Sequence, residues 1–365
     1  MTVKIGIIGC GAITRRAYLP GFAAPGTKEA MKANPYFLHG GTENGEVIAL
    51  ADIEINNTKS LADEFKVKYI YQDWKELIAN KEIDAVCINT PNTLHAEMTI
   101  AAARAGKHVM VEKPMAATME EADAMIEATE KNGVFLMVNQ TQRFWPIHEV
   151  AAAIIQSGLI GRIFSVRGKM GHAGPEYWSP GSDWFGQKKI SGHGALFDIG
   201  IHKLDFIRYM TGLKITEVAA FTETLGKNID VEDNAAVIFK FENNTLGILE
   251  ASWTCNPSEN TTFVYGEQGN LRIGMDPEKP IYVEFATAKP ALSRDIPTGK
   301  ITNGIYVPKV PERSKLGGPW KHFVDSIIKG EKPTPSGEEG RDSLEVILAA
   351  FESATQGKTI TLRKY

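Results

Sequence analysis

The chain has 365 residues, of which 43% are hydrophobic and 23% charged, a composition typical of a globular protein with about two domains. Its net charge of −4 comes from well-mixed acids and bases, so no basic stripe indicates a nucleic-acid partner. No apolar run reaches the roughly 18 residues of a membrane span, and no signal peptide precedes the first strand pattern. Three widely spaced cysteines indicate neither a disulfide framework nor a zinc site, so we expect a cytoplasmic protein.

The first 140 residues alternate short apolar runs with helical patterns. The runs are rich in Val and Ile, as in strands that are buried on both faces. They cover 3–9, 46–52, 84–90, 107–113 and 134–140. Helical windows lie between them, at 58–66, 73–79, 93–105 and 119–131. This alternation predicts a doubly wound α/β domain with a parallel sheet, and we assign residues 1–140 to it.

A glycine-rich turn directly follows the first predicted strand. In a strand–turn–helix unit the first glycine allows a tight turn, and the second lets backbone N–H groups approach a pyrophosphate. The cofactor-binding residues predicted in this turn are Gly9, Gly11, Ala12 and Ile13. The third position of the pattern is Thr14 instead of Gly or Ala, which predicts looser packing between helix and strand.

Asp52 ends the second predicted strand. A carboxylate at this place accepts hydrogen bonds from ribose hydroxyls and repels a 2′-phosphate, so it favours NAD over NADP. Asp52 follows Gly11 by 41 residues, whereas the usual spacing is about 20, and we assign the excess to an insertion at 24–45. The alternative is a solvated acid at a strand end.

After about residue 144 the pattern changes to strands and turns. Helices are predicted at 146–157, 195–211 and 319–329, and a fourth runs to Gln356 from a capping box of Ser336 and Glu339. Alternating runs around Asn243-Asn244 predict a hairpin over 235–253, and further strands follow it. Such alternation indicates a sheet with one covered face and one available face. The stretch 288–318 is predicted to be a long irregular connection.

The predicted helix 195–211 raises a question about its polar residues. Asp198, His202 and Asp205 stand at i, i+4 and i+7, on one side of a helix that is otherwise apolar and rich in glycine. A core histidine with satisfied hydrogen bonds is one interpretation of His202. A metal site is another, but no further His or Cys stands at ligand spacing, so no metal is predicted.

Four segments together resemble a known family. They are IGIIGCGAI, INTPNTLHAEMTIAAARAGKHVMVEKPMA, NQTQRF and GALFDIGIHKLD, and the resemblance to the Gfo/Idh/MocA oxidoreductases runs nearly end to end. The combination of Glu-Lys-Pro with a later Asp-x-x-x-His is more specific than a glycine turn alone. The resemblance implies a Rossmann domain, then an α+β domain at 141–365 with a large, mostly antiparallel open sheet. It also implies a homodimer or homotetramer that buries this sheet.

The resemblance carries catalytic roles to Lys113, Asp198 and His202. Oxidation of a secondary alcohol removes the hydroxyl proton while hydride leaves the carbon, and His202 is the natural acid/base for this proton. Lys113 can donate a hydrogen bond to the reacting oxygen. Asp198 could hold substrate hydroxyls or orient the imidazole. These roles would explain why the helix keeps an imidazole and a carboxylate. For Asp205 we expect a helix-face salt bridge.

The resemblance also implies further contacts. Additional cofactor-binding residues would be Thr90, Pro91, Asn92, His95, Glu112 and Lys113, although His95 could instead cap the following helix. Arg143 and Trp184 are candidate substrate contacts, with packing between domains as the alternative. Family members often carry other residues near Tyr18 and at Trp184-Phe185, and these departures leave the substrate open.

The predicted function is therefore an NAD-dependent oxidoreductase acting on a secondary hydroxyl of a sugar, an inositol or a glycoside. The first alternative is an NAD-dependent glycoside hydrolase that oxidises, eliminates and re-reduces. The second is a binding protein that senses sugar or NAD without catalysis.

Overall fold

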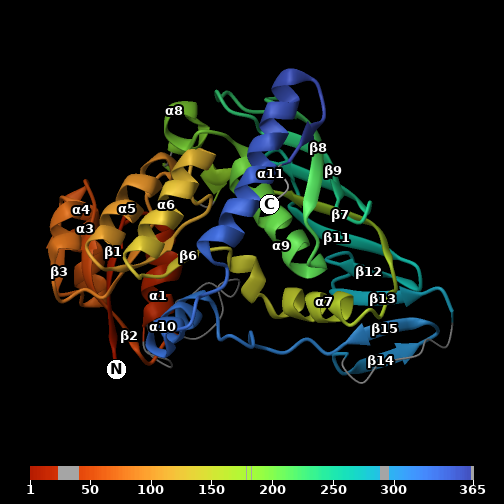
Figure 1. Ribbon diagram of the computed structural model, residues 1–365, viewed down its shortest axis with the longest axis horizontal. Coiled ribbons are helices and arrows are strands. Elements are labelled where there is room, and N and C mark those ends of the chain that lie inside the picture. The colour runs from red at the N-terminus through yellow and green to blue at the C-terminus, as the bar shows by residue number, and fades with distance from the viewer. Residues whose placement is uncertain (24–40, 178, 182, 288–295, 363–365) are drawn as a thin grey trace. The chain divides into compact units, whose positions relative to one another are not determined.

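The computed structural model describes residues 1–23, 41–177, 179–181, 183–287 and 296–362 (Figure 1). The chain forms two compact units. Unit 1 consists of Met1–Phe144 and Arg313–Asp342, and unit 2 of Trp145–Glu312 and Ser343–Tyr365. The predicted second domain, 141–365, thus includes a stretch, Arg313–Asp342, that packs with the first unit.

Unit 1 is built on a six-stranded sheet with the order β3-β2-β1-β4-β5-β6. Neighbouring strands are parallel, and the sheet confirms the predicted doubly wound fold. The strands are β1 Val3–Ile8, β2 Gly45–Ala51, β3 Tyr69–Tyr71, β4 Ala85–Ile88, β5 His108–Val111 and β6 Leu136–Val138. Only the short edge strand β3 was not predicted.

Helices of unit 1 pack around this sheet. They are the π-helical turn η1 Thr14–Tyr18, α1 Leu19–Phe22, α3 Ile55–Phe65, α4 Trp74–Ala79, α5 His95–Arg104, α6 Met119–Lys131 and α10 Pro319–Lys329. Short 3₁₀ turns lie at η3 Asn92–Leu94 and η4 Thr141–Phe144. Trp320 and Phe323 of α10 join Tyr18, Phe22 and the inner residues of β1 in one apolar core. Burial of these large side chains explains why a segment so late in the chain belongs to unit 1.

Unit 2 contains a ten-stranded sheet with the order β14-β15-β13-β12-β11-β7-β10-β9-β8-β16. Among the described strands of this sheet, only β7 and β10 pair in parallel. The sheet is therefore mostly antiparallel, as predicted. Its strands are β7 Ile163–Gly171, β8 Ile215–Glu223, β9 Asn234–Phe241, β10 Leu246–Ser252, β11 Glu259–Gly266, β12 Gly269–Ile273, β13 Ile281–Phe285, β14 Gly299–Thr302, β15 Ile305–Pro308 and β16 Ile360–Thr361.

One face of this sheet is covered by helices. Helix α9 Ile201–Thr211 packs on β7 and on α7 Pro146–Gln156, and Figure 1 displays both helices in front of the strands. The other face exposes Phe221, Ile238 and Leu246. The predicted arrangement of one covered and one available face is confirmed. The remaining helical segments are η5 Pro175–Tyr177, η6 Trp184–Gly186, α8 Lys188–Ser191, the π-helical turn η7 Leu196–Gly200 and α11 Gly337–Gln356.

The prediction of an irregular connection over 288–318 is wrong for residues 299–308. Strands β14 and β15 form a hairpin there, and Asn303 and Gly304 take the left-handed backbone angles of a two-residue turn. Residues 288–295 and most of the predicted insertion at 24–45 lie outside the described residues. No described helix has both the length and the apolar character needed to cross a membrane.

Candidate functional site

The glycine-rich turn lies at the carboxyl end of β1. Gly9 has a φ of 95°, and a Cβ atom there would lie 2.6 Å from the Asn89 carbonyl oxygen, so the turn requires glycine. Gly11 differs, because no atom lies within 4 Å of the position that its Cβ would take. The backbone at Gly11 is therefore open to a ligand, as a bound pyrophosphate requires.

Thr14 stands where the dinucleotide pattern has its third glycine. Its buried hydroxyl donates to the Gly9 carbonyl at 2.5 Å and accepts from the Asn89 side-chain amide at 2.8 Å. The Leu19 N–H donates to the Thr14 carbonyl, five residues back, which closes the π-helical turn η1. The predicted looser packing is wrong, because the hydroxyl ties the helix start to the ends of β1 and β4.

Asp52 follows β2 directly, as predicted. Its Oδ2 accepts from the Cys10 N–H at 2.6 Å and its Oδ1 from the Glu54 N–H at 2.8 Å. Beside the turn lies a pocket of about 230 Å³, lined by Cys10, Gly11, Ala12, Arg15, Asn57, Ser60 and Leu61. An oriented carboxylate next to an open glycine and a pocket is the arrangement that a nucleoside with a free ribose diol needs. These residues therefore fit NAD.

Replacing Asp52 with serine should shift cofactor preference towards NADP. The substitution removes the charge that repels a 2′-phosphate, while Arg15 still lines the same pocket. Hydrogen bonds to charged groups contribute about 1.5–3 kcal/mol, so the ratio of kcat/KM with NADP to that with NAD should rise at least about tenfold. Steady-state kinetics with both cofactors measures this ratio. Asp63→Ser, at an exposed acid of α3, is the control, and an equal ratio in both variants would remove Asp52 from cofactor selection.

Lys113 follows β5 at the same edge of the sheet, and its neighbour Glu112 anchors the loop. Glu112 Oε1 accepts from the Tyr18 hydroxyl and the Asn139 side-chain amide, each at 2.7 Å. The Lys113 N–H donates to Glu112 Oε2 at 3.3 Å. Burial raises the pKa of Glu112, and the nearby Lys113 charge opposes this rise. Glu112 is thus fixed by Tyr18 and Asn139, and it in turn holds the backbone N–H of Lys113.

His95 connects two loops that end neighbouring strands. It is fully buried at the start of α5, with Nδ1 2.9 Å from the Pro114 carbonyl oxygen and Nε2 2.9 Å from the Thr90 carbonyl oxygen. Burial lowers its pKa to about 4, so the ring is neutral at pH 7 and its single N–H donates to one of the two carbonyls. His95 therefore lies between the turn of Thr90, Pro91 and Asn92 and the loop of Lys113. Its place is behind these loops.

Arg143 and Trp184, the candidate substrate contacts, have close neighbours inside their own units. Arg143 is buried and forms an ion pair with Glu339, the acid of the capping box that opens α11. Trp184 stacks on Phe185 with ring centroids 3.8 Å apart. Arg143 thus holds the start of α11 against η4, which accounts for its burial without a substrate.

Asp198 and His202 lie on either side of a change in helix geometry. The Ile201 N–H donates to the Leu196 carbonyl, five residues back, so η7 is a π-helical turn that continues into α9. Asp198, within η7, is buried and accepts from the Trp253 indole N–H at 3.3 Å. His202, in the first turn of α9, is partly exposed. Such π turns are frequent at functional sites.

Asp205 is buried one turn further along α9. Its Oδ1 accepts from the Ser343 hydroxyl at 3.0 Å, and this hydroxyl accepts from Arg208 at 2.7 Å. Asp205 thus joins α9 to α11 within unit 2, away from any exposed helix face. Lys113 and the predicted cofactor residues belong to unit 1, whereas Asp198 and His202 belong to unit 2.

Two further histidines of unit 2, His193 and His172, contact local groups. His193 stacks on Phe351 with centroids 3.7 Å apart, and burial lowers its pKa to about 4. His172 Nδ1 accepts from the Gly174 N–H at 2.9 Å. Within the described ranges, no group of three or more His, Cys, Asp or Glu side chains is placed to hold a metal ion.

Lys203, next to His202, lies on the side of α9 that packs against the sheet. It is 1% exposed, and its ammonium donates to the Asn260 side-chain oxygen at 2.6 Å and the Thr262 hydroxyl at 2.9 Å. A Cβ at Gly168 would lie 2.8 Å from the Lys203 side chain, so this glycine makes room for the lysine stem on β7. Both hydrogen-bond partners are neutral, and burial lowers the pKa of Lys203 to about 7.

This buried lysine predicts a pH-dependent stability. Between pH 7 and 10.5 the unfolded chain binds more protons than the folded chain, so the free energy of unfolding should rise with pH in this window. Lys203→Met removes the titrating group at similar volume. The difference in unfolding free energy between wild type and variant should be flat below about pH 7. Above this pH the unfolding free energy of the wild type should rise relative to that of the variant by a few kcal/mol in total, at about 1.4 kcal/mol per unit of pKa shift.

Urea unfolding across this pH range measures the difference between wild type and Lys203→Met. The control is Lys131→Met, at an exposed position of α6, for which the difference should not change with pH. A Lys203→Met difference that is constant from neutral to alkaline pH would contradict the lowered pKa of the buried lysine.

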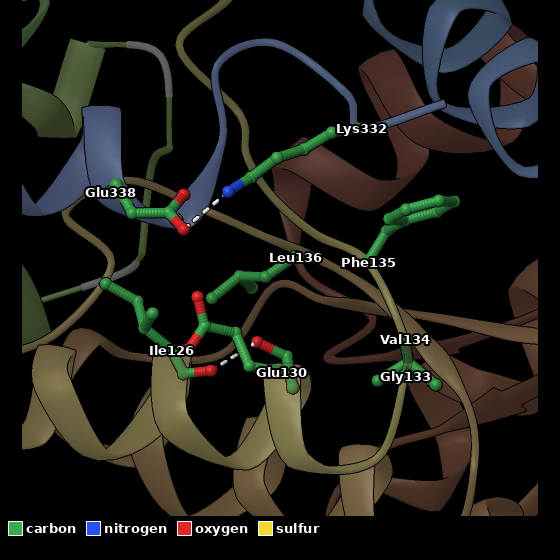
Figure 2. A pocket seen from close by; sticks show the side chains of 10 residues that line it. Ile126, Glu130, Gly133, Val134, Phe135, Leu136, Lys332 and Glu338 are labelled. Atoms are coloured by element: carbon green, nitrogen blue, oxygen red, sulfur yellow. Dashed lines mark hydrogen bonds and ion pairs between the residues drawn. The ribbon is translucent and has the colours of Figure 1, made fainter. Parts of the chain in front are cut away.

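A second pocket in unit 1 has a volume of about 260 Å³ (Figure 2). The end of α6, the start of β6 and the start of α11 form its walls, and the ion pair of Lys332 and Glu338 lies at its edge. Its lining residues are Ile126, Thr129, Glu130, Gly133, Val134, Phe135, Leu136, Lys332, Gly337 and Glu338. None of the predicted site residues lines this pocket.

Several residues that organise the site had no signal in the sequence. Tyr18 and Asn139 contact Glu112 across sequence separations of 94 and 27 residues, and Trp253 reaches Asp198 across 55. Glu232 contacts the start of the Asp198 helix across 38 and 36 residues.

Two family models match the chain. The model described as an oxidoreductase family with an NAD-binding Rossmann fold matches residues 3–140. The model described as the GFO/IDH/MocA C-terminal domain matches residues 148–272. Together they cover the sheet of unit 1 and the unit 2 strands from β7 into β12.

Similar proteins include named dehydrogenases. Levoglucosan dehydrogenase from Pseudarthrobacter phenanthrenivorans is 34% identical over 271 residues, which is 66% of this chain and 68% of that protein. Myo-inositol 2-dehydrogenase from Thermotoga maritima is 27% identical over 321 residues, 87% of this chain and 91% of that protein. A solved structure of levoglucosan dehydrogenase in complex with NADH and levoglucosan superposes with a TM-score of 0.82, at 28% identity, over 100% of both chains.

Proposed function

Because the chain belongs to the Gfo/Idh/MocA oxidoreductase family, we propose that it oxidises a secondary hydroxyl of a sugar or polyol with NAD. Family membership confirms the predicted oxidoreductase class, the Rossmann fold and NAD as cofactor. The specific substrate and the roles of individual residues are parts of the proposal.

One observation carries the proposal. Across the π turn between η7 and α9, a buried carboxylate, Asp198, is followed four residues later by a partly exposed imidazole, His202. The Trp253 indole fixes one carboxylate oxygen. A proton-transfer group must be accessible to its substrate, as His202 is. Its orienting partner must have a fixed position, as Asp198 has.

The residues that would hold NAD are the open turn at Gly11 and Ala12, the ribose acceptor Asp52 and the turn that begins at Thr90. NAD when bound supplies the acceptor for the hydride. His202 takes the proton from the substrate hydroxyl as general base, and returns it in the reverse direction. Lys113 donates a hydrogen bond to the reacting oxygen and stabilises its developing negative charge. The negative charge of Asp198 favours the protonated, positively charged form of His202 that results from this proton transfer.

The names of the relatives support a polyhydroxylated substrate. The proteins compared above are named for levoglucosan and myo-inositol, which both carry secondary hydroxyls on a six-membered ring. We propose that this chain acts on a molecule of this class. Levoglucosan and myo-inositol are accordingly the first substrates to test.

The experiment is an absorbance assay for NADH. The purified protein is mixed with NAD and, in turn, with levoglucosan, inositols, aldoses and aryl glycosides. NADH formation with one of these polyols is the expected result. Release of the aglycone from a glycoside in an NAD-dependent manner, with no NADH, would instead favour the glycoside hydrolase, and NAD binding with neither product would favour the sensor.

We further propose a homodimer or homotetramer in a reducing, cytoplasmic setting. The uncovered face of the ten-stranded sheet exposes Phe221, Ile238 and Leu246, which a second copy could bury. All three cysteines are free thiols, as in a reducing compartment. Light scattering of the purified protein measures the oligomer, and a monomer at micromolar concentration would contradict the proposed assembly.

A further inference from the structure

The acidic segment Asp230-Val231-Glu232-Asp233 precedes β9, and all three of its carboxylates accept from backbone N–H groups outside the segment. Asp230 accepts from Lys188 at 2.7 Å, at the start of α8. Asp233 accepts from Leu225 and Gly226 at 2.7 Å and from Lys227 at 2.8 Å. We call these residues the acidic segment. It therefore bonds to the backbone at the start of α8 and at residues 225–227.

Glu232 acts on the helix that carries Asp198 and His202. Its Oε2 accepts from the Gly194 N–H at 2.8 Å, and its Oε1 from the Leu196 N–H at 3.0 Å. Its backbone carbonyl accepts from the Ala195 N–H at 2.9 Å. The first N–H groups of a helix have no acceptors within the helix, and they carry partial positive charge. A carboxylate supplies the acceptors and balances this charge.

The contact is tight and buried. Glu232 is 7% exposed, and burial raises its pKa to about 7 against the opposing effect of the backbone N–H groups. A Cβ at Gly194 would lie 1.9 Å from the Glu232 carbonyl oxygen, so only glycine allows this approach. Among the described residues no basic side chain forms an ion pair with Glu232, and burying such an acid is costly. The backbone hydrogen bonds offset that cost.

The acidic segment also reaches Asp198 by a second route. The Trp253 N–H donates to the Asp233 carbonyl at 2.8 Å, and the Trp253 indole N–H donates to Asp198 Oδ2 at 3.3 Å. The Asp198 N–H in turn donates to the Gly194 carbonyl at 2.9 Å. The backbone and the carboxylate of Asp198 are therefore held by two residues, Gly194 and Trp253, that both contact the acidic segment.

We propose that Glu232 is a positioning residue that sets where the Asp198–His202 helix begins, and thereby how both side chains face the substrate. This inference rests on the proposed function for its effect on turnover. Its effect on Asp198 does not depend on which reaction the chain performs. No residue of the cofactor half of the site, in unit 1, takes part in it.

The test is Glu232→Gln, which keeps the shape and removes the charge. We expect kcat to fall about 10- to 100-fold, the size of effect that a small misplacement of catalytic groups produces, while the Kd for NAD is unchanged. Asp230→Asn is the matched control, because it removes an acid of the same segment that caps α8 instead, and its kcat should be unchanged. If Glu232→Gln does not fold, Glu232→Asp keeps the charge and withdraws it by one methylene, with the same expected direction.

A spectroscopic measurement separates positioning from stability. The chain has six tryptophans, so ¹⁵N-tryptophan labelling yields six indole N–H signals, and Trp253→Phe identifies the one that faces Asp198. This signal should shift in Glu232→Gln and stay in place in Asp230→Asn. An unmoved indole signal in Glu232→Gln would overturn the inference. Absence of turnover in the wild type would count against the proposed function only, and the indole signal would still test the inference. A lower melting temperature with unchanged kcat would also overturn it, because Glu232 would then be structural only.

Discussion

Lys113→Met should lower kcat by about 10²- to 10⁴-fold and leave the Kd for NAD nearly unchanged. The side chain supplies the hydrogen bond that stabilises negative charge on the reacting oxygen, and methionine keeps its bulk without a donor. The loop itself should survive, because the Lys113 backbone N–H bonds to Glu112 and the Pro114 carbonyl faces His95.

Stopped-flow or steady-state kinetics with the substrate found in the NADH assay measures kcat. Titration of NAD followed by protein fluorescence measures its Kd. Lys131→Met serves as the control, since Lys131 is exposed at the end of α6. A kcat like that of the wild type would exclude Lys113 from the chemistry, and an equal loss of NAD affinity would reassign it to cofactor binding.

His202→Ala should lower kcat by a similar factor, about 10²- to 10⁴-fold, because it removes the general base. His202 is partly exposed, so the space left by the ring is reachable from solvent. We therefore expect added imidazole to restore part of the activity in proportion to its concentration. Binding of NAD should not change, because His202 belongs to unit 2 and the predicted cofactor residues to unit 1.

The control for this rescue is Lys113→Met, in which imidazole should restore nothing, because the missing group there is a cationic donor. An undiminished kcat in His202→Ala would remove the histidine from the mechanism. Equal stimulation of both variants by imidazole would show that the added base acts elsewhere.

The parallel sheet of unit 1 was predictable because its strands are buried on both faces. Continuous Val and Ile runs, such as those of β1 and β4, have no other common origin in a chain of this composition. The predicted capping box of Ser336 with Glu339 is a local pattern, and it is present. Strand β3 was missed because three residues are too few for a periodic pattern.

The hairpin of β14 and β15 carried a signal that was overlooked. Asn303-Gly304 is a typical two-residue turn, and both residues take positive φ angles. The surrounding Pro, Gly and Lys residues obscured it. Position Thr14 was misjudged for another reason, because a hydroxyl can replace close packing with hydrogen bonds to Gly9 and Asn89.

Motifs located the candidate site, but its supports depend on long-range contacts. The Glu-Lys-Pro and Asp-x-x-x-His patterns are local, so Lys113, Asp198 and His202 could be proposed from the sequence. The supporting contacts form only after folding: Tyr18 bonds to Glu112, Trp253 to Asp198, and Glu232 to the Leu196 N–H. The π turn of η7 also has no signature in hydrophobic periodicity, because all five of its residues are buried and no exposed face marks the inserted residue.

The most direct test of the central claim follows one atom. Once the polyol substrate is known, it is prepared with deuterium on the carbon that bears the reacting hydroxyl, and the NADH that forms is analysed by mass spectrometry. The account predicts that deuterium appears in NADH in proportion to the ketone product. Product formation with no deuterium in NADH, or glycoside cleavage that leaves NAD unreduced, would contradict it.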